Sequence, residues 1–334
     1  MKISVIIPTY NSSRFIAATV ESVFRQTLQP DEILILDDGS TDDTIPIIHS
    51  CGPRVTLFEQ ANHGVAAARN ELCRLANGDL IAFLDHDDLW HPKYLEVQHN
   101  AFLKNPAAVA FFTGHVNFSG ADNYCWPDKL VGNHLETELI APLDFFQRYN
   151  QAAGSFASMT YCCVPRTVLA RLGNEPFHPA VAGVDDSYLL YLLCLQGPVC
   201  YTPVHLAAYR VWGGAQSQAG VKNYASWVKA FELLEGRYRE KNDPKMLNAF
   251  RLAFALKRRR YGKLLMGSGQ IPEARRQFCE ASRISSSFAS RSKSLALWLL
   301  TMLPGKCQPA WPVGDRESAD KMMNYHWFRK SGHN

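Results

Sequence analysis

Three groups of aspartates mark the places where this sequence could do chemistry. They lie at residues 37–42 (Asp-Asp-Gly-Ser-Thr-Asp), at residues 85–88 (Asp-His-Asp-Asp) and at the pair Asp185 and Asp186. Carboxylates can hold a nucleotide, ligate a hard divalent cation and accept the proton of an attacking hydroxyl. Transfer of a sugar from a nucleoside diphosphate needs all three, because a cation offsets the charge on the departing diphosphate. Capping of helices and turns is the ordinary role of aspartates, and it explains one such group more easily than three.

Short apolar runs alternate with helical periodicity in the first hundred residues. The runs predict strands buried on both faces, at residues 3–8, 33–36, 55–58, 80–84 and 108–112. Helices are predicted between them, the first capped by Ser12 or Ser13, at residues 16–24, 65–76 and 92–104. This alternation predicts a Rossmann-like α/β fold with a mostly parallel sheet and helices on both faces. Ligands bind at the carboxyl ends of such strands, where the first two aspartate groups stand.

The rest of the chain contains an irregular segment, a second set of short elements and a helical region. Residues 117–139 are rich in turn formers. The elements expected after them are strands at 159–164, 199–201 and 206–211 and helices at 143–149, 166–172 and 186–195. After Gly214 only helical periodicity remains, basic residues are frequent, and residues 261–282 predict a helical hairpin. We therefore expect an α/β domain over residues 1–219 and a basic, all-helical C-terminal region over residues 220–334.

Composition limits the partners and the location. With 47% hydrophobic residues and a net charge of only +4 in 334 residues, the chain is typical of a globular protein, and no nucleic-acid partner is expected. Its nine cysteines lack paired metal-ligand spacing, which favours a reduced, cytoplasmic location. The longest apolar run, residues 295–303, is too short to cross a bilayer. Residues 291–302 could instead form a helix in peripheral contact with the inner face of a membrane, but apolar residues run almost all round it, which favours burial.

Four ordered motifs carry a resemblance to a known enzyme family. They are Pro8-Thr9-Tyr10-Asn11, Asp37-Asp38-Gly39-Ser40-Thr41-Asp42, Gly64 with Ala68-Arg69-Asn70, and Phe83-Leu84-Asp85-His86-Asp87-Asp88. Their order and spacing resemble those of family 2 glycosyltransferases, which are inverting enzymes of the GT-A fold. Residues 173–186, Tyr209-Arg210, Gly213-Gly214 and Ser217 also look like that family, so the resemblance extends from residue 2 to about residue 217.

The resemblance implies a site for a nucleotide-diphosphate sugar, with UDP as the expected nucleotide. Asp38 matches the aspartate that accepts a hydrogen bond from the base, and Pro8 and Tyr10 match positions that line the base. Tyr10 is expected to stack on it. Asp37 is expected to assist at the base or ribose, and Arg69 resembles an arginine near the nucleotide.

The resemblance also implies a metal ion and a catalytic base. Asp85 and Asp87 match the D-x-D motif, in which Asp85 would face the ribose or sugar and Asp87 would ligate Mn²⁺ or Mg²⁺ on the diphosphate. Asp88 is expected to orient the loop. Asp186 matches the catalytic base, and Asp185, where the family often has glutamate, is expected near the diphosphate or the acceptor.

Three positions near the expected site need separate treatment. Arg210 is expected to reach the diphosphate or an anionic acceptor, and a surface arginine at a strand end is an equal alternative. The family often has a metal-binding histidine two residues later, where this sequence has Trp212; His205 is a weak candidate to replace it. The family often has an arginine after the catalytic base, where this sequence has Leu192 and Leu193.

The implied reaction is a single displacement that inverts the configuration of the sugar. The expected acceptor is a saccharide or a lipid-linked saccharide, in the synthesis of cell-surface polysaccharide or lipopolysaccharide. A sugar-phosphate nucleotidyltransferase shares the architecture, but it needs a glycine-rich phosphate loop after the first strand, and residues 10–14 contain no glycine. A catalytically degenerate scaffold that binds nucleotide sugars is the second alternative, because the histidine and the arginine are missing.

Overall fold

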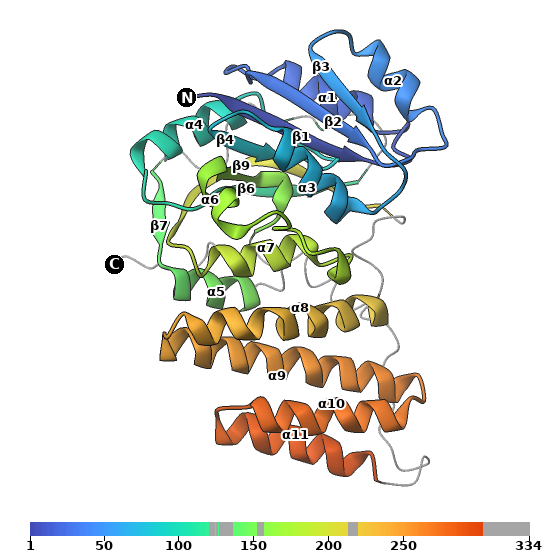
Figure 1. The fold of residues 1–334 in the computed structure, drawn as a ribbon, viewed down its shortest axis with the longest axis vertical. Coiled ribbons are helices and arrows are strands. Elements are labelled where there is room, and N and C mark those ends of the chain that lie inside the picture. The colour runs from blue at the N-terminus through green and yellow to red at the C-terminus, as the bar shows by residue number, and fades with distance from the viewer. Residues whose placement is uncertain (120–123, 125, 127–135, 152–156, 213–219, 303–334) are drawn as a thin grey trace. The chain divides into compact units, whose positions relative to one another are not determined.

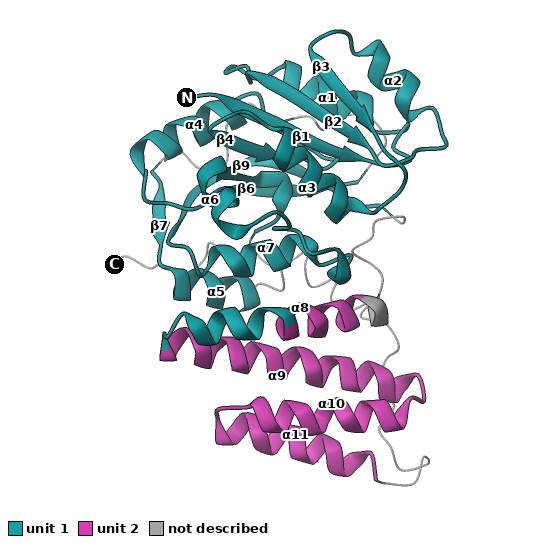
Figure 2. Cartoon of the chain, in the orientation of Figure 1, with its two compact units in different colours: residues 1–217, 233–243 teal, residues 218–232, 244–334 magenta. Residues whose placement is uncertain are grey.

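The structure is a computed structural model that describes residues 1–119, 124, 126, 136–151, 157–212 and 220–302 (Figure 1). The chain divides into two compact units (Figure 2), one of residues 1–217 with 233–243 and one of residues 218–232 with 244–334. The boundary expected between residues 219 and 220 stays a prediction, because residues 213–219 lie outside the described ranges. The motif residues Gly213, Gly214 and Ser217 lie outside them as well.

A sheet organises the first unit. Within the described residues it has nine strands in the order β3-β2-β1-β4-β8-β6-β9-β5, and β7 pairs with β9. The strands are β1 (Ile3–Thr9), β2 (Glu32–Asp37), β3 (Val55–Glu59), β4 (Leu80–Phe83), β5 (Leu89–Trp90), β6 (Phe111–Phe118), β7 (Glu138–Ile140), β8 (Cys162–Pro165) and β9 (Val199–Arg210). Strands β3, β2, β1 and β4 are all parallel, and the far half of the sheet mixes both directions. The expected Rossmann-like α/β fold is confirmed.

Seven α-helices of the described residues belong wholly to this unit. They are α1 (Ile16–Phe24), α2 (Thr44–Ser50), α3 (Val65–Leu75), α4 (Tyr94–Lys104), α5 (Pro142–Gln151), α6 (Arg166–Leu172) and α7 (Asp185–Leu193).

The order of the strands indicates where a ligand can bind. The chain moves outward from β1 to β2 and β3, then returns to place β4 on the other side of β1. Because such crossovers are right-handed, α1 and α2 lie on one face of the sheet and α3 on the other. The reversal falls between β1 and β4, and ligands bind at the carboxyl ends of the strands beside such a reversal.

The central strands match the apolar runs of the sequence. All residues of β1 and β4 are buried, as expected for strands covered on both faces. The strand predicted at 108–112 instead begins at Phe111 and continues to Phe118, and the two strands predicted at 199–201 and 206–211 are the single strand β9. The first part of the strand predicted at 159–164 is a turn of 3₁₀ helix. Apolar runs therefore predicted that the strands exist but not where the outer ones end.

The prediction that Ser12 or Ser13 caps α1 is wrong. No side chain caps this helix, and the hydroxyl of Ser12 is hydrogen-bonded to the hydroxyl of Thr9. The carbonyl of Ser12 accepts hydrogen bonds from the backbone N–H groups of Phe15 and Ile16, at 2.9 and 3.0 Å. The serine thus ties the end of β1 to the turn that begins α1.

The second unit is helical. Its elements are α8 (Gly220–Glu240), whose residues from 233 onward belong to the first unit, α9 (Pro244–Gly267), α10 (Ile271–Ile284) and α11 (Phe288–Leu300). Helices α9 and α10 form the predicted hairpin, with Gly269 in the left-handed region at a φ of +77°. Burial of residues 291–302 was the favoured expectation, and it is wrong for Leu295, Leu299 and Met302, which are exposed.

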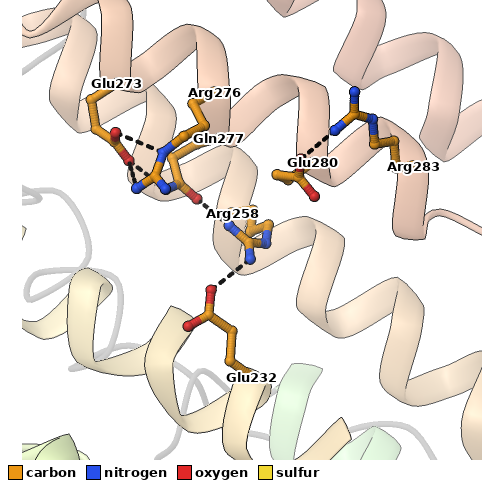
Figure 3. Close-up of polar contacts among 7 residues, drawn as sticks. All are labelled: Glu232, Arg258, Glu273, Arg276, Gln277, Glu280 and Arg283. Atoms are coloured by element: carbon orange, nitrogen blue, oxygen red, sulfur yellow. Dashed lines mark hydrogen bonds and ion pairs between the residues drawn. The ribbon is translucent and has the colours of Figure 1, made fainter.

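Arg258 joins three helices of this unit (Figure 3). Its Nη2 donates to Oε1 of Glu232 on α8 and its Nη1 donates to Oε1 of Gln277 on α10, both at 2.7 Å. Nε2 of Gln277 in turn donates to Oε1 of Glu273 at 2.7 Å. Arg258 is buried, whereas the side chain of Arg283, which pairs with Glu280 on α10 alone, is 70% exposed.

Replacing Arg258 by methionine should therefore destabilise the helical unit by about 2 kcal/mol, because both partners lose a charged donor. The measurement is hydrogen exchange resolved on α9 and α10. Arg283→Met is the matched control, and it should change stability by less than about 0.5 kcal/mol because its ion pair is exposed. Equal protection in the two variants would contradict a structural role for Arg258.

Candidate active site

Arg69 is the centre of the candidate site. From α3 it donates through Nη2 to Oδ1 of Asp85 and through Nη1 to Oδ2 of Asp185, both at 2.6 Å. Its guanidinium is buried and lies 5.5 Å from the ring centroid of Phe177. Burial acts to lower the pKa of Arg69, but Asp85, Asp185 and Asp186 outweigh it and hold that pKa above its usual value. These contacts bring the loop after β4 and the start of α7 together around one cation.

Asp186 lies beside this pair in the first turn of α7. Its Oδ1 accepts hydrogen bonds from the backbone N–H of Ser187 at 2.6 Å and from the hydroxyl of Ser187 at 3.1 Å. That hydroxyl lies 2.5 Å from the hydroxyl of Tyr149 on α5. Burial and the charge of Asp185 raise the pKa of Asp186 to about 6, although Arg69 acts to lower it. A carboxylate of this pKa is ionised at neutral pH and still has appreciable affinity for a proton.

The loop after β4 is fixed to the end of β9. Nε1 of Trp212 donates to Oδ2 of Asp87 at 2.7 Å, and Nε of Arg210 donates to the backbone carbonyl of Asp87 at 2.7 Å. The backbone N–H of Arg210 donates to Oδ1 of Asp88 at 2.7 Å. Burial and the charges of Asp87 and Asp85 raise the pKa of Asp88 well above its usual value. The buried Asp88 carboxyl therefore helps to hold the loop, as expected from the sequence.

Arg210 is not a surface residue. It is 1% exposed, and its guanidinium lies 4.6 Å from the ring centroid of Phe15 and 4.4 Å from that of Phe118. The alternative of a surface arginine is therefore wrong, because the residue packs between two aromatic rings. The Trp212 ring also packs edge-to-face with the ring of Phe15, with centroids 5.3 Å apart. The end of β9 and the start of α1 thus support the loop of Asp87.

Asp38 connects β2 to the start of α3. Its Oδ1 accepts from Nε2 of Gln60 at 2.7 Å and from the backbone N–H of His63 at 2.9 Å, and its Oδ2 accepts from the backbone N–H of Gly64 at 2.7 Å. Gly64 precedes α3 with a φ of +89°, a conformation that favours glycine. Asp38 therefore anchors the helix that carries Arg69, and a nucleotide base would have to share its oxygens with these donors.

The other residues expected at the nucleotide lie at the ends of β1 and β2. Oδ2 of Asp37 accepts from the backbone N–H groups of Gly39 and Ser40, at 3.1 and 2.8 Å, so this carboxylate holds the turn after β2. Pro8 is buried in β1, and Tyr10 is 44% exposed just beyond it. An exposed ring at this edge is open to contact with a ligand.

The sequence of this chain matches a known protein family. A family model described as "Glycosyl transferase family 2" matches residues 4–171, which is half of the chain. The chain belongs to glycosyltransferase family 2. This glycosyltransferase is 41% identical over 251 residues to an uncharacterized glycosyltransferase of Nostoc sp., a match that covers 69% of this chain and 76% of that one.

Relatives with named activities match over shorter stretches. Chondroitin synthase of Escherichia coli is 37% identical over 133 residues, which is 37% of this chain and 19% of that protein. The Escherichia coli UDP-Glc:alpha-D-GlcNAc-diphosphoundecaprenol beta-1,3-glucosyltransferase WfgD is 35% identical over 139 residues, which is 40% of this chain and 54% of that protein. The match thus spans about a fifth of the first relative and about half of the second.

Solved structures show the same fold. Residues 1–349 of S. aureus TarS in complex with UDP-GlcNAc superpose with a TM-score of 0.65 at 16% identity, over 90% of each chain. The mannosyltransferase PcManGT from Pyrobaculum calidifontis, in complex with GDP-Man and Mn²⁺, superposes with a TM-score of 0.54 at 20% identity, over 92% of this chain and 84% of that one.

The donor set of this glycosyltransferase fits a loosely held metal ion. Among the described residues, no three His, Cys, Asp or Glu side chains form a group that could hold a metal. Oδ2 of Asp87 accepts a hydrogen bond from the indole N–H of Trp212. Within the described part of the chain, Oδ1 of Asp87 is the oxygen that could ligate a cation. An indole N–H is only a donor and cannot ligate a metal. A hard cation here would depend on one carboxylate, the diphosphate and water, which suits Mg²⁺.

The structure does not support the other candidate contacts. His205 pairs with Gly114 at a register shift between β6 and β9. Among the described residues, the partners of Asp87 are Arg210 and Trp212 and do not include His205. Leu192 and Leu193, where the family often has an arginine, are buried in the core.

A surface hollow of about 360 Å³ lies elsewhere on the first unit. Its lining includes Met1, Asp79, Pro165 and Arg166. These residues flank the amino ends of β1 and β4 and the end of β8, whereas the aspartates stand at the carboxyl ends of the parallel strands. The hollow is therefore not part of the candidate active site.

Proposed function

We propose that this glycosyltransferase moves a sugar from a nucleotide-diphosphate donor, a UDP-sugar, to a hydroxyl of a saccharide or lipid-linked saccharide. The proposal rests mainly on Arg69, which gathers Asp85, Asp185 and Asp186 beside the reversal between β1 and β4. The UDP-GlcNAc complex of TarS and the UDP-Glc donor in the name of WfgD support the nucleotide. The diphosphoundecaprenol acceptor in the same name supports a lipid-linked saccharide, and with it a role in cell-surface polysaccharide or lipopolysaccharide synthesis.

The proposed mechanism is a single displacement. Asp186 accepts the proton of the acceptor hydroxyl. As it does so, the hydroxyl oxygen of the acceptor attacks the anomeric carbon from the face opposite the nucleotide. The bond from that carbon to the diphosphate oxygen breaks, the electron pair leaves with the diphosphate, and the configuration inverts. The pKa of Asp186, raised to about 6 by burial and Asp185, suits a base that works near neutral pH.

The remaining residues bind and orient the donor in this proposal. Tyr10 stacks on the base beside Pro8, Asp38 accepts from the base, and Asp37 holds the adjacent turn. Asp85 orients the ribose or sugar while paired with Arg69. A Mn²⁺ or Mg²⁺ ion, when bound at Asp87, supplies positive charge against the departing diphosphate. Asp185 positions Arg69, to which it is bound. Arg210 positions Asp87, because it donates a hydrogen bond to the backbone carbonyl of that residue.

The proposed location is the cytoplasm, or the inner face of a membrane when the acceptor is lipid-linked. Every cysteine that the structure describes is free, as in a reducing compartment. Among the described residues, no helix has the length and apolar character needed to span a bilayer.

A thermal-shift screen tests donor and metal together. UDP-sugars are expected to raise the melting temperature more than GDP- or dTDP-sugars, and the shift should increase when Mn²⁺ or Mg²⁺ is added, because ligands that bind only the folded state stabilise it. Product formation across a panel of acceptors follows for the preferred donor. No shift with any donor would overturn the proposal, and binding without turnover would favour a non-catalytic scaffold.

Replacing Trp212 by phenylalanine tests the support of Asp87. The ring is expected to keep its packing on Phe15 while Asp87 loses its indole donor. The affinity for Mn²⁺ in the presence of UDP should fall by about 10-fold or more, as is typical when a partner of a metal ligand is removed. Calorimetry measures this, with Trp227→Phe in the helical unit as the control. Unchanged metal affinity would mean that Trp212 does not position Asp87 for a cation.

A further inference from the structure

Helix α11 buries a row of polar side chains against its own unit and leaves several large apolar side chains exposed. Ser290 and Ser294, and Thr301 just after the helix, are buried. Arg259 Nη1 donates to Oγ of Ser290 at 2.8 Å and to Oγ of Ser294 at 3.2 Å, and Arg275 Nε donates to Oγ1 of Thr301 at 3.1 Å. Rolling the helix to bury its other face would separate both guanidinium groups from these partners, which is costly.

The outer face of α11 carries what we call the apolar stripe. Phe288 is 87% exposed, Leu295 46%, Leu299 59% and Met302 48%. At about 100° per residue Phe288, Leu295 and Leu299 fall within about 40° of one another around the helix, and Met302 follows just beyond its end. In the described part of the helical unit, no other large apolar residue is as exposed as these four. A contiguous apolar face of this kind marks an interaction surface.

The charges on the exposed face of α11 are all positive. Arg291 and Lys293 are exposed. At about 100° per residue Arg291 lies beside the stripe, whereas Lys293 lies about 120° from it, at the other edge of the exposed face of the helix. The sequence of residues 281–302 contains no aspartate or glutamate. A second copy of this face would bring cations against cations, so the complementary partner is anionic. Aliphatic and aromatic residues with cations on the same exposed face are the pattern of a helix that lies in a membrane interface.

We infer that the apolar stripe inserts into the surface of an anionic lipid bilayer, with Arg291 beside it at the headgroup phosphates and Lys293 adding positive charge on the same exposed face. Helix α11 has 13 residues, about 20 Å in length, and would lie in the plane of the interface. Leu297 and Trp298 stay with the core cluster of Leu265, Met266, Ala274 and Phe278, so docking needs no unfolding of the unit. The inference does not depend on which sugar is transferred or on Asp186.

Vesicle flotation of the full-length protein tests this surface. The protein is expected to float with phosphatidylcholine vesicles that contain phosphatidylglycerol and to remain at the bottom with phosphatidylcholine alone. The double variant Leu295→Gln/Leu299→Gln should lower the bound-to-free ratio by about 10-fold or more, because it removes apolar area from the interface. Arg291→Gln/Lys293→Gln should also lower the bound-to-free ratio for the anionic vesicles, because it removes the positive charge of the exposed face.

Leu103→Gln is the matched control, because Leu103 on α4 of the first unit is 58% exposed, like Leu299. It should float as the unchanged protein does, and circular dichroism should show all variants folded. Absence of flotation, or flotation unchanged in the double leucine variant, would overturn the inference. Self-association that the leucine variant abolishes, without any flotation, would assign the stripe to a second copy of the chain and would also overturn it.

Discussion

The Asp186→Asn variant is expected to lose sugar transfer while it keeps its affinity for the nucleotide. The amide can still accept the hydrogen bond from the N–H of Ser187, but it cannot take a proton from the acceptor. Loss of a positioned base typically costs roughly 10²–10⁴ in rate. Product formation from the preferred donor measures the loss, and calorimetry with UDP measures binding. Asp144→Asn is the matched control, because Asp144 is an exposed aspartate in the first turn of α5.

The pH dependence of the unchanged enzyme adds a second readout. Asp186 accepts a proton only when it is ionised, so kcat/KM should rise with pH through about 6 and then level off. The raised pKa also means that folding favours the protonated form, so Asp186 costs stability as the pH rises from about 4 through about 6. The asparagine variant should therefore melt at a higher temperature than the unchanged protein at pH 7, with no difference near pH 3. Transfer at the unchanged rate in this variant would remove Asp186 from the role of base.

The sequence predicted the parallel half of the sheet and the edge where the chemistry lies. Strands β1, β2 and β4 are covered on both faces, so they appear as continuous apolar runs, and the aspartates after β2 and β4 mark their carboxyl ends. Strand β9 was predicted in two pieces, because it lies at the mixed side of the sheet and alternates in burial between residues 201 and 205. Strands β5 and β7 are too short for periodicity to reveal, and helix α2 buries only Thr44 and Ile48, so it has no apolar face that the sequence could show.

The contacts between distant residues could not be predicted from the sequence. Arg69 and Asp185 are 116 positions apart, and Asp87 and Trp212 are 125 apart. Motif spacing selects the residue types, but it does not say which donor meets which carboxylate. From the sequence, Trp212 was only a tryptophan where the family often has a histidine. In the structure its indole N–H donates a hydrogen bond to Asp87. In α11 the periodicity predicted a helix, but polar partners on α9 and α10 decide which face it buries.

Removing the cation between the aspartates should have the largest effect on stability. In Arg69→Met, the carboxylates of Asp85 and Asp185 lose their shared donor while Asp186 stays close by. Breaking a buried pair by removing one partner costs about 3–5 kcal/mol, because the remaining charge is left buried and unpaired. Denaturant unfolding of the first unit measures this. Arg74→Met on the same helix is the matched control, because Arg74 pairs with Glu71 in an exposed i,i+3 contact worth less than about 0.5 kcal/mol.

The same substitution links the structure of the site to its chemistry. Arg69 acts to lower the pKa of Asp186, so its removal should raise that pKa and move the acid limb of the pH–rate profile to higher pH in whatever activity remains. Adding Asp185→Asn to Arg69→Met should recover part of the lost stability, because one of the unpaired carboxylates becomes neutral. Two results together would contradict this role of Arg69. Arg69→Met and Arg74→Met would unfold at the same denaturant concentration, and the acid limb of the pH–rate profile would stay where it is. The aspartates would then not depend on Arg69 to share one site. Recovery in the double variant, together with a displaced limb, would show that one buried arginine both stabilises the junction of α3, β4 and α7 and tunes the base.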